Sequence, residues 1–146
     1  MKRIALGLLA CFALWQARAG DVDWQTDLPK AQAKAKAEKK LVMLDFTGSD
    51  WCGWCIRLNK EVFSKPEFVQ YAQTNLVAVE VDFPRLKKQT EEQKKANQAL
   101  QEKYKIEGYP TIIVLNGAGE QVGQLGYMPG GPKAFIAELE KLKKKA

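Results

Sequence analysis

The sequence predicts one α/β domain with a mixed central sheet and helices on both faces of that sheet. Short apolar runs of strand length at 41–46, 76–82 and 111–115 alternate with longer segments that have helical patterning. The last run is followed by turn-forming residues at 116–119 and by a further strand at 121–125, which makes a hairpin. Because strand–helix alternation produces parallel strands and a hairpin adds an antiparallel one, the sheet should be mixed.

An extra helix is expected before the first strand. Residues 30–40 are rich in alanine and lysine, which favours a helix, and the lysines are interpreted as its solvated face. Four apolar residues precede the strand at helical spacing: Trp24, Leu28, Ala31 and Ala35. The strand at 41–46 is itself short, apolar and almost uncharged, as a buried strand is.

Two helices should connect the first strand to the second. One is expected to run from the cysteine pair to about Val62. The next should begin with residues 64–67, which have the pattern of a capping box, with Phe63 and Phe68 placed as its hydrophobic staple. A second capping-box pattern at 90–93 predicts another helix after the second strand.

The C-terminal part should be a hairpin followed by a helix. Residues 108–110 interrupt the chain just before the strand at 111–115. Residues 130–132, Gly-Gly-Pro, are expected to open the last helix. Its apolar stripe consists of Phe135, Ile136, Leu139 and Leu142.

Residues 51–55, Trp-Cys-Gly-Trp-Cys, place two thiols three positions apart, directly after the first strand and the polar loop 47–50. If Cys52 opens a helix, the two sulfurs can share one disulfide at the N-terminus of that helix. The first helical amides and the axial dipole would then favour the thiolate of Cys52. A redox-active pair is therefore expected.

Other roles for the cysteines fit the sequence less well. A bridge around two intervening residues constrains little of the unfolded chain, so it is a weak structural staple. The chain contains no histidine, so zinc and copper sites lack their usual ligands, and Ile56 stands where haem attachment needs a histidine. We expect no metal and no cofactor.

The first 19 residues have the layout of a secretory signal. A cationic start at 1–3 is followed by an apolar run at 4–15 and by Ala17-Arg18-Ala19, so cleavage is expected after Ala19. The 12 apolar residues would span only about 18 Å as a helix. The alternatives are a retained anchor, a buried first helix, or a lipoprotein with its lipid on Cys11.

Removal of 1–19 changes the bulk properties of the chain. The formal net charge is +6 with 23 basic and 17 acidic residues, and loss of Lys2, Arg3 and Arg18 leaves about +3. No nucleic-acid partner is expected from such a charge. Residues 20–146 should form a single domain with only Cys52 and Cys55 left, in an oxidising compartment such as the periplasm or the exterior.

The element order, the Trp-Cys-x-x-Cys motif at 51–55 and a Tyr-Pro-Thr motif at 109–111 before the hairpin together resemble the thioredoxin family. The resemblance covers residues 24–142. It extends to exported thioredoxin-like domains with an additional N-terminal helix, a group similar to the periplasmic DsbD C-terminal domain. It implies the thioredoxin fold and thiol–disulfide oxidoreductase activity.

The resemblance also implies roles for individual residues. Cys52 matches the family's exposed nucleophile and Cys55 its resolving thiol, which together form the disulfide. Pro110 matches the cis-proline that faces the disulfide, and the Tyr109 backbone would pair with an extended substrate segment. Asp45 matches a buried acid that accepts the Cys55 proton, although an edge-facing, solvated Asp45 is the alternative.

The sequence departs from the family at several of these positions. The loop between Asp45 and Cys52 is one residue longer than in ordinary thioredoxin, and Ala78 is expected in place of the lysine that commonly accompanies the acid. Gly53-Trp54 replaces the usual Gly-Pro between the cysteines. We interpret Gly53 and Trp54, with Trp51 beside them, as part of a substrate-contacting rim; packing of both tryptophans in the core is the alternative.

The predicted function is thiol–disulfide exchange with protein thiols and disulfides in the periplasm, by a monomer with a membrane or periplasmic redox partner. Reductase, oxidase and isomerase roles all fit, because couples of this fold span about −270 to −120 mV. The alternative function is a redox-inactive thioredoxin-fold module that binds peptides or proteins.

Overall fold

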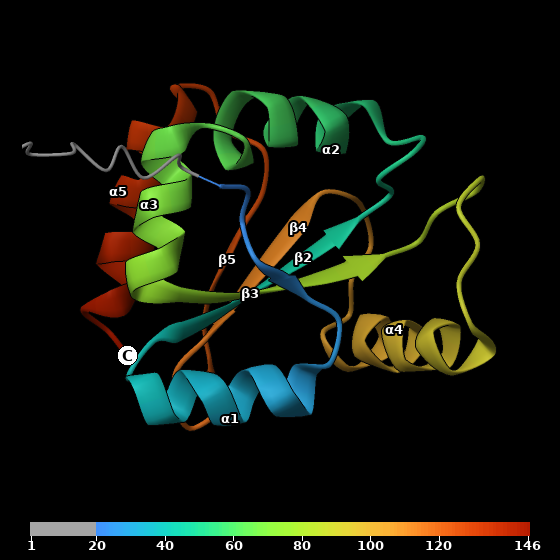
Figure 1. Cartoon of the computed structure of the whole chain (residues 1–146), viewed down its shortest axis with the longest axis horizontal. Coiled ribbons are helices and arrows are strands. Elements are labelled where there is room, and N and C mark those ends of the chain that lie inside the picture. Colours follow the sequence, from blue (N-terminus) through green and yellow to red (C-terminus); the bar gives the residue numbers. More distant parts are fainter. Residues whose placement is uncertain (1–19) are drawn as a thin grey trace, which may run out of the picture.

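The computed structural model describes residues 20–146, so the predicted signal 1–19 and Cys11 lie outside the described residues. A five-stranded sheet has the strand order β1-β3-β2-β4-β5 (Figure 1). The strands are β1 (Trp24–Gln25), β2 (Leu41–Thr47), β3 (Leu76–Asp82), β4 (Thr111–Leu115) and β5 (Gln121–Leu125). The helices are α1 (Leu28–Glu38), α2 (Gly53–Leu58), a π-helical turn η1 (Asn59–Phe63), α3 (Pro66–Asn75), α4 (Glu91–Lys103) and α5 (Gly131–Lys143).

The sheet is mixed, as the sequence predicts. β3 lies between β1 and β2 and is parallel to both, whereas β4 is antiparallel to β2 and to β5. The parallel part comes from the strand–helix alternation, and the antiparallel part from the hairpin. The expected α/β fold class with an N-terminal helix is confirmed.

Helices cover both faces of the sheet and divide the core into two layers. One layer lies under α3 and α5 and contains Phe63, Phe68 and Phe135 with inward-facing residues of β2 and β4. The other lies under α1 and α4 and includes Ala31 and Ala35 (Figure 1). Successive residues of β2 contribute to opposite layers because side chains alternate along a strand, which explains why all seven of its residues are buried.

The N-terminal segment differs from the prediction. Trp24 does not belong to the first helix but lies in β1, where it pairs with Ala78 of β3. α1 starts only at Leu28, because Asp27 is its N-cap and accepts a hydrogen bond from the Lys30 amide at 3.0 Å. The Trp24 ring packs against Phe63, with 5.4 Å between ring centroids. A strand of two residues is too short for the hydrophobic pattern to reveal it.

Only one of the two predicted capping boxes caps a helix through its hydroxyl. Thr90 is the N-cap of α4 and accepts a hydrogen bond from the Gln93 amide at 3.1 Å. At α3 the prediction is wrong: the N-cap is Lys65, which makes no side-chain cap, and α3 begins at Pro66. The residue before a proline is disfavoured in helical conformation, so Lys65 is extended and Ser64 stays one position outside the helix.

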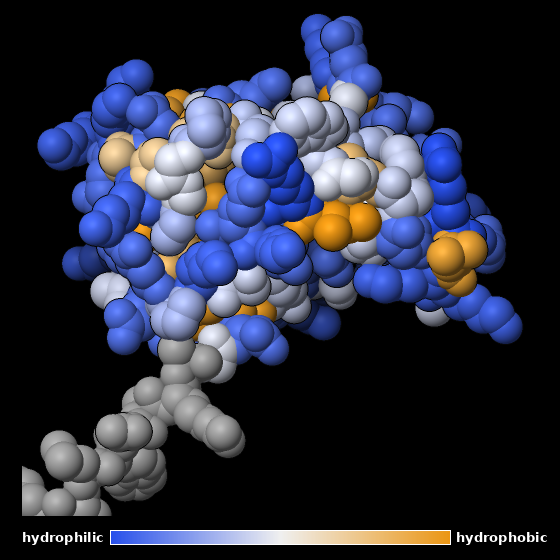
Figure 2. All heavy atoms as spheres, turned by 90° about the horizontal axis from the view of Figure 1, so that it is seen from above, coloured by the Kyte–Doolittle hydropathy of each residue, from blue (hydrophilic) through white to orange (hydrophobic). Residues whose placement is uncertain are grey.

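The surface on the side of α2 is largely hydrophilic, with a few separate hydrophobic patches (Figure 2). Among residues 20–146, the large hydrophobic side chains that are exposed are Trp54, Ile56 and Leu86. None of the helices described in this range has both the length and the apolar character needed to cross a membrane.

Candidate functional site

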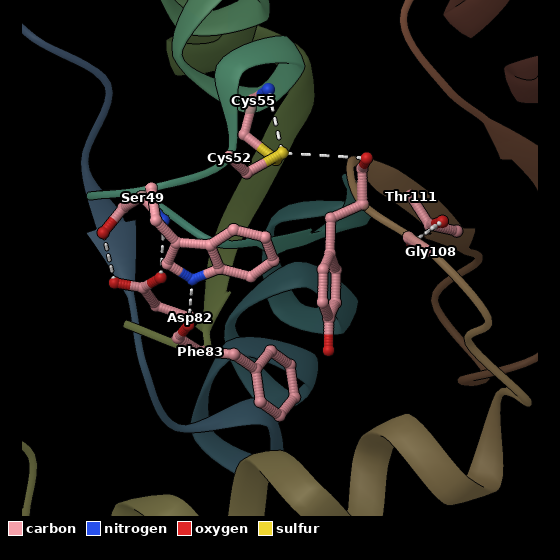
Figure 3. Close-up of a disulfide and its surroundings, with 9 residues drawn as sticks. Ser49, Cys52, Cys55, Asp82, Phe83, Gly108 and Thr111 are labelled. Carbon is pink, nitrogen blue, oxygen red and sulfur yellow. Dashed lines mark hydrogen bonds between the residues drawn. A yellow bond between two sulfur atoms is a disulfide. The ribbon is translucent and has the colours of Figure 1, made fainter. Parts of the chain in front are cut away.

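Cys52 and Cys55 form a disulfide at the start of α2 (Figure 3). Cys52 is the N-cap of this helix, and its Sγ accepts a hydrogen bond from the Cys55 amide at 3.3 Å. The 47–50 loop brings the chain from the end of β2 to this position. A thiolate on Cys52 would therefore lie against a helical amide and the positive end of the helix dipole, both of which stabilise negative charge.

The loop before β4 faces the disulfide from the opposite side. The Tyr109–Pro110 peptide bond is cis, as the family resemblance implies for Pro110. The Tyr109 carbonyl oxygen lies 3.7 Å from the Cys52 Sγ (Figure 3). The backbone next to Pro110 thus lies beside the sulfur that would join a substrate.

Trp51 is held in an aromatic cluster at this site. Its indole nitrogen donates a hydrogen bond to the Phe83 carbonyl oxygen at 2.7 Å, and its ring meets Tyr109 edge-on with 6.0 Å between centroids. Phe83 stacks on Tyr109 at 5.3 Å, and the guanidinium of Arg85 lies 3.9 Å from the centre of the Trp51 ring. Trp51 is only partly exposed, so it buttresses the Tyr109 loop from within.

Trp54 points outward and has its own support. Its side chain is 54% exposed and lies against Tyr127, with 4.9 Å between ring centroids. Arg57 lies over both rings, at 5.4 and 5.3 Å. Glu61 accepts hydrogen bonds from Arg57 Nε and from the Tyr127 hydroxyl, both at 2.7 Å. These contacts hold the Trp54 indole in a defined position, where it is exposed to solvent. In the sequence, Trp54 directly precedes Cys55 of the disulfide.

Gly53 is exposed, and a Cβ at this position would meet no atom within 4 Å. No close approach of the folded chain therefore requires a glycine there.

Asp45 lies in the middle of β2 and is 7% exposed. Its Oδ1 has no hydrogen-bond partner within residues 20–146. It lines a cavity of about 450 Å³ together with Cys55, so the carboxyl group and this cysteine border the same space. Burial raises the pKa of Asp45 to about 8, and the neighbouring carboxylates of Glu80 and Asp82 add to the rise.

Ala78 is not the strand partner of Asp45. The strand register pairs Asp45 with Glu80, whereas Ala78 lies opposite Met43. Ala78 and Glu80 are two residues apart and face the same side, so the apolar pattern alone could not distinguish the two registers. The position next to the buried acid is therefore occupied by a second acid rather than by a small apolar residue.

The loop after β3 is attached to the loop that precedes Cys52, which the sequence did not reveal. The Asp50 carboxylate accepts hydrogen bonds from the backbone amides of residues 85–87 at 2.8–2.9 Å. These amides lower the pKa of Asp50. Asp82 Oδ1 accepts a hydrogen bond from the Ser49 amide at 2.9 Å (Figure 3). In the sequence, the only indication of this attachment is that Asp50 and Asp82 lie near turn-forming residues. That position does not identify the groups to which they bind.

Residues 20–146 contain no group of three or more Cys, Asp or Glu residues arranged to hold a metal ion.

Comparisons with known proteins agree with this arrangement. A family model described as a thioredoxin-like domain matches residues 28–143. The disulfide bond reductase DsbH of Chlamydia pneumoniae is 36% identical over 122 residues, which cover 84% of this chain and 73% of that protein. A solved structure of a DsbH oxidoreductase, also 36% identical, superposes with a TM-score of 0.81 over 90% of this chain and 92% of the other.

A longer relative matches over one part of its length. The thiol:disulfide interchange protein DsbD of Pasteurella multocida (strain Pm70) is 30% identical over 115 residues, which is 77% of this chain but only 18% of that protein.

Proposed function

Since the chain belongs to the thioredoxin family and is a thiol–disulfide oxidoreductase of its DsbD-like group, we propose that it reduces disulfides of periplasmic proteins through Cys52 and Cys55. The observation that carries the proposal is the disulfide at a helix start, directly opposite the Tyr109–Pro110 loop. A disulfide that only stapled the fold would have no need of a cis-proline loop facing it and a buried acid behind it.

The reaction proceeds in two exchanges. The Cys52 thiolate attacks one sulfur of the substrate disulfide, so that a Cys52–substrate bond forms and the other substrate sulfur leaves as a thiolate. Cys55 loses its proton and attacks the Cys52 sulfur, which forms the Cys52–Cys55 bond and releases the second substrate sulfur. The substrate gains two electrons from the cysteine pair, and its two thiolates take up two protons, one released by Cys55 and one from solvent.

The substrate lies along the face made by Trp54 and the Tyr109 backbone. An extended segment could pair with the Tyr109 backbone as an added strand, which holds the substrate disulfide beside Cys52 without a sequence requirement. Trp54, exposed and supported by Tyr127, supplies apolar contact area next to the pair.

Two further observations support the proposed direction of the reaction and the proposed location of the protein. The DsbH relative is named a disulfide bond reductase, and reduction of substrates leaves this chain oxidised, so a membrane or periplasmic dithiol protein must return the electrons. The sequence of residues 1–19 supports export with cleavage after Ala19, which leaves the domain 20–146 to act as a monomer.

The experiment that tests the proposal is trapping of the mixed disulfide. In a Cys55→Ser protein the second exchange is impossible, so we expect substrate proteins to accumulate linked to Cys52 and to be released by a reductant. Cys52→Ser is the matched control and should trap none. Trp54→Ala in the trapping variant should lower the yield. If Cys55→Ser trapped nothing and the wild type reduced no model disulfide, the proposal would be wrong.

A further inference from the structure

The cavity behind Cys55 gathers more charge than the exchange reaction itself requires. Four acidic or basic side chains line it beside Cys55: Asp21, Asp45, Glu80 and Lys87. Asp45 is almost fully buried and its Oδ1 has no partner, which is costly for a polar group unless it serves a function.

Glu80 is the immediate neighbour of Asp45. The two residues are paired in the parallel register of β2 and β3, where strands lie about 4.8 Å apart, and both line the cavity. Glu80 is half-buried, and within residues 20–146 neither carboxyl group is part of a salt bridge. Two carboxylates this close resist simultaneous ionisation.

Two of the other charged groups around the pair are held by hydrogen bonds. Asp82, on the same strand, is hydrogen-bonded to the amide and the hydroxyl of Ser49. The ammonium of Lys87 donates to the Ser49 hydroxyl at 3.0 Å. Asp21 reaches the cavity from the N-terminal segment. Glu80 is therefore the neighbour that lies beside Asp45 without a hydrogen-bonded partner of its own among the described residues.

We propose that Asp45 and Glu80 share one proton and act as a carboxyl pair that takes the proton of Cys55, with Glu80 as the positioning residue that sets the pH at which Asp45 ionises. This inference rests on the proposed exchange reaction. It adds a residue that the family resemblance did not indicate.

The electrostatics of the cavity support the pairing. Burial raises the pKa of Asp45 to about 8, with Glu80 as the next cause and Asp82 after it. Burial and Asp82 also raise the pKa of Glu80, whereas Lys87 lowers it. The charge of Glu80 thus favours the protonated form of Asp45, the more deeply buried partner.

The pair serves both halves of the redox cycle. When Cys55 attacks the mixed disulfide, its S–H proton moves to the Asp45 carboxylate as the Cys52–Cys55 bond forms and the substrate sulfur leaves. When a dithiol partner reduces the bond again, Asp45 returns a proton to the Cys55 sulfur. Glu80, which is nearer to solvent, gives this proton an exit through the cavity.

Glu80→Gln tests the inference, because it removes the charge and keeps the shape. We expect the pH at which resolution of a mixed disulfide reaches half its maximal rate to fall by about one unit. The carboxyl carbon of Asp45, followed by NMR in the oxidised protein, should titrate at a correspondingly lower pH. Glu80→Asp should restore the wild-type behaviour, and Glu67→Gln, exposed on α3, should change neither readout.

The outcomes separate this inference from the proposed function. Unchanged titration of Asp45 and an unchanged pH profile in folded Glu80→Gln would overturn the pairing even if Cys55→Ser traps substrates. A shifted Asp45 titration in a protein that traps nothing would support the pairing and reject the proposed reaction.

Discussion

A carboxyl group inside a buried strand costs free energy, and Asp45 holds such a position in β2. An asparagine or a small apolar residue would fold there at lower cost. The same burial gives Asp45 a pKa of about 8, close to the pH range in which a thiol exchanges its proton. At this residue, reactivity is gained at the expense of stability.

Asp45→Asn should therefore stabilise the protein, increasingly so as the pH rises. The unfolded carboxyl ionises near pH 4, but the folded one holds its proton to about pH 8, so the free energy of unfolding of the wild type falls as the pH rises between these values. We expect the advantage of the variant to grow by roughly 4 kcal/mol from pH 5 to pH 8, at about 1.4 kcal/mol per unit. Urea unfolding of both proteins at the two pH values measures it.

The comparison of the two proteins at pH 5 is the internal control, because most of the pH-dependent loss in the wild type's free energy of unfolding occurs above that pH. An advantage that stays constant with pH would show that Asp45 ionises normally and is not the proton acceptor. The same variant should slow the resolution of a mixed disulfide.

The role of an individual residue could be predicted where a short motif determines the local geometry. The pairing of Cys52 with Cys55 was indicated by a local motif and the cis-proline at Pro110 by the family resemblance, and the apolar neighbours of Asp45 already indicated burial. Glu80 could not be assigned, because its role depends on the register between two strands, and a shift of two residues leaves the apolar pattern unchanged.

Among the elements, the two capping-box patterns show how one proline changes a helix start. Thr90 caps α4 with its hydroxyl, but Pro66 moves the start of α3 and leaves Ser64 outside it. The sequences 64–67 and 90–93 both fit the pattern, so the difference lies in the backbone restriction that proline places on Lys65. The two-residue β1 and the π-helical η1 likewise have no periodic signal of their own.

Thr90→Ala should lower the free energy of unfolding by about 1 kcal/mol, because the Gln93 amide loses its partner. Ser64→Ala is the matched control: it removes only an exposed bond to the Lys60 carbonyl oxygen and should cost less than about 0.5 kcal/mol. Chemical denaturation of both variants measures the difference. Equal losses would contradict the assigned helix starts.

At the scale of the whole molecule, the sheet separates two cores and carries the site at one end. The alternation of strands and helices predicted this architecture, because the central strands β2, β3 and β4 are buried on both faces and helices cover each face. The attachment of the 83–90 loop to the segment before Cys52 was not predictable, since it depends on hydrogen bonds between residues more than 30 positions apart. It places Phe83 and Arg85 around Trp51 and completes the wall of the site.

The central claim is that Cys52 and Cys55 exchange electrons with other proteins rather than staple the fold. Equilibration of the purified protein with glutathione buffers of known potential, read out by the fraction of disulfide, tests it most directly. A reductase predicts a two-electron transition between about −270 and −200 mV, the range of thioredoxin and the glutaredoxins. A potential below about −300 mV would identify a structural bridge, and one near −120 mV would reverse the proposed direction.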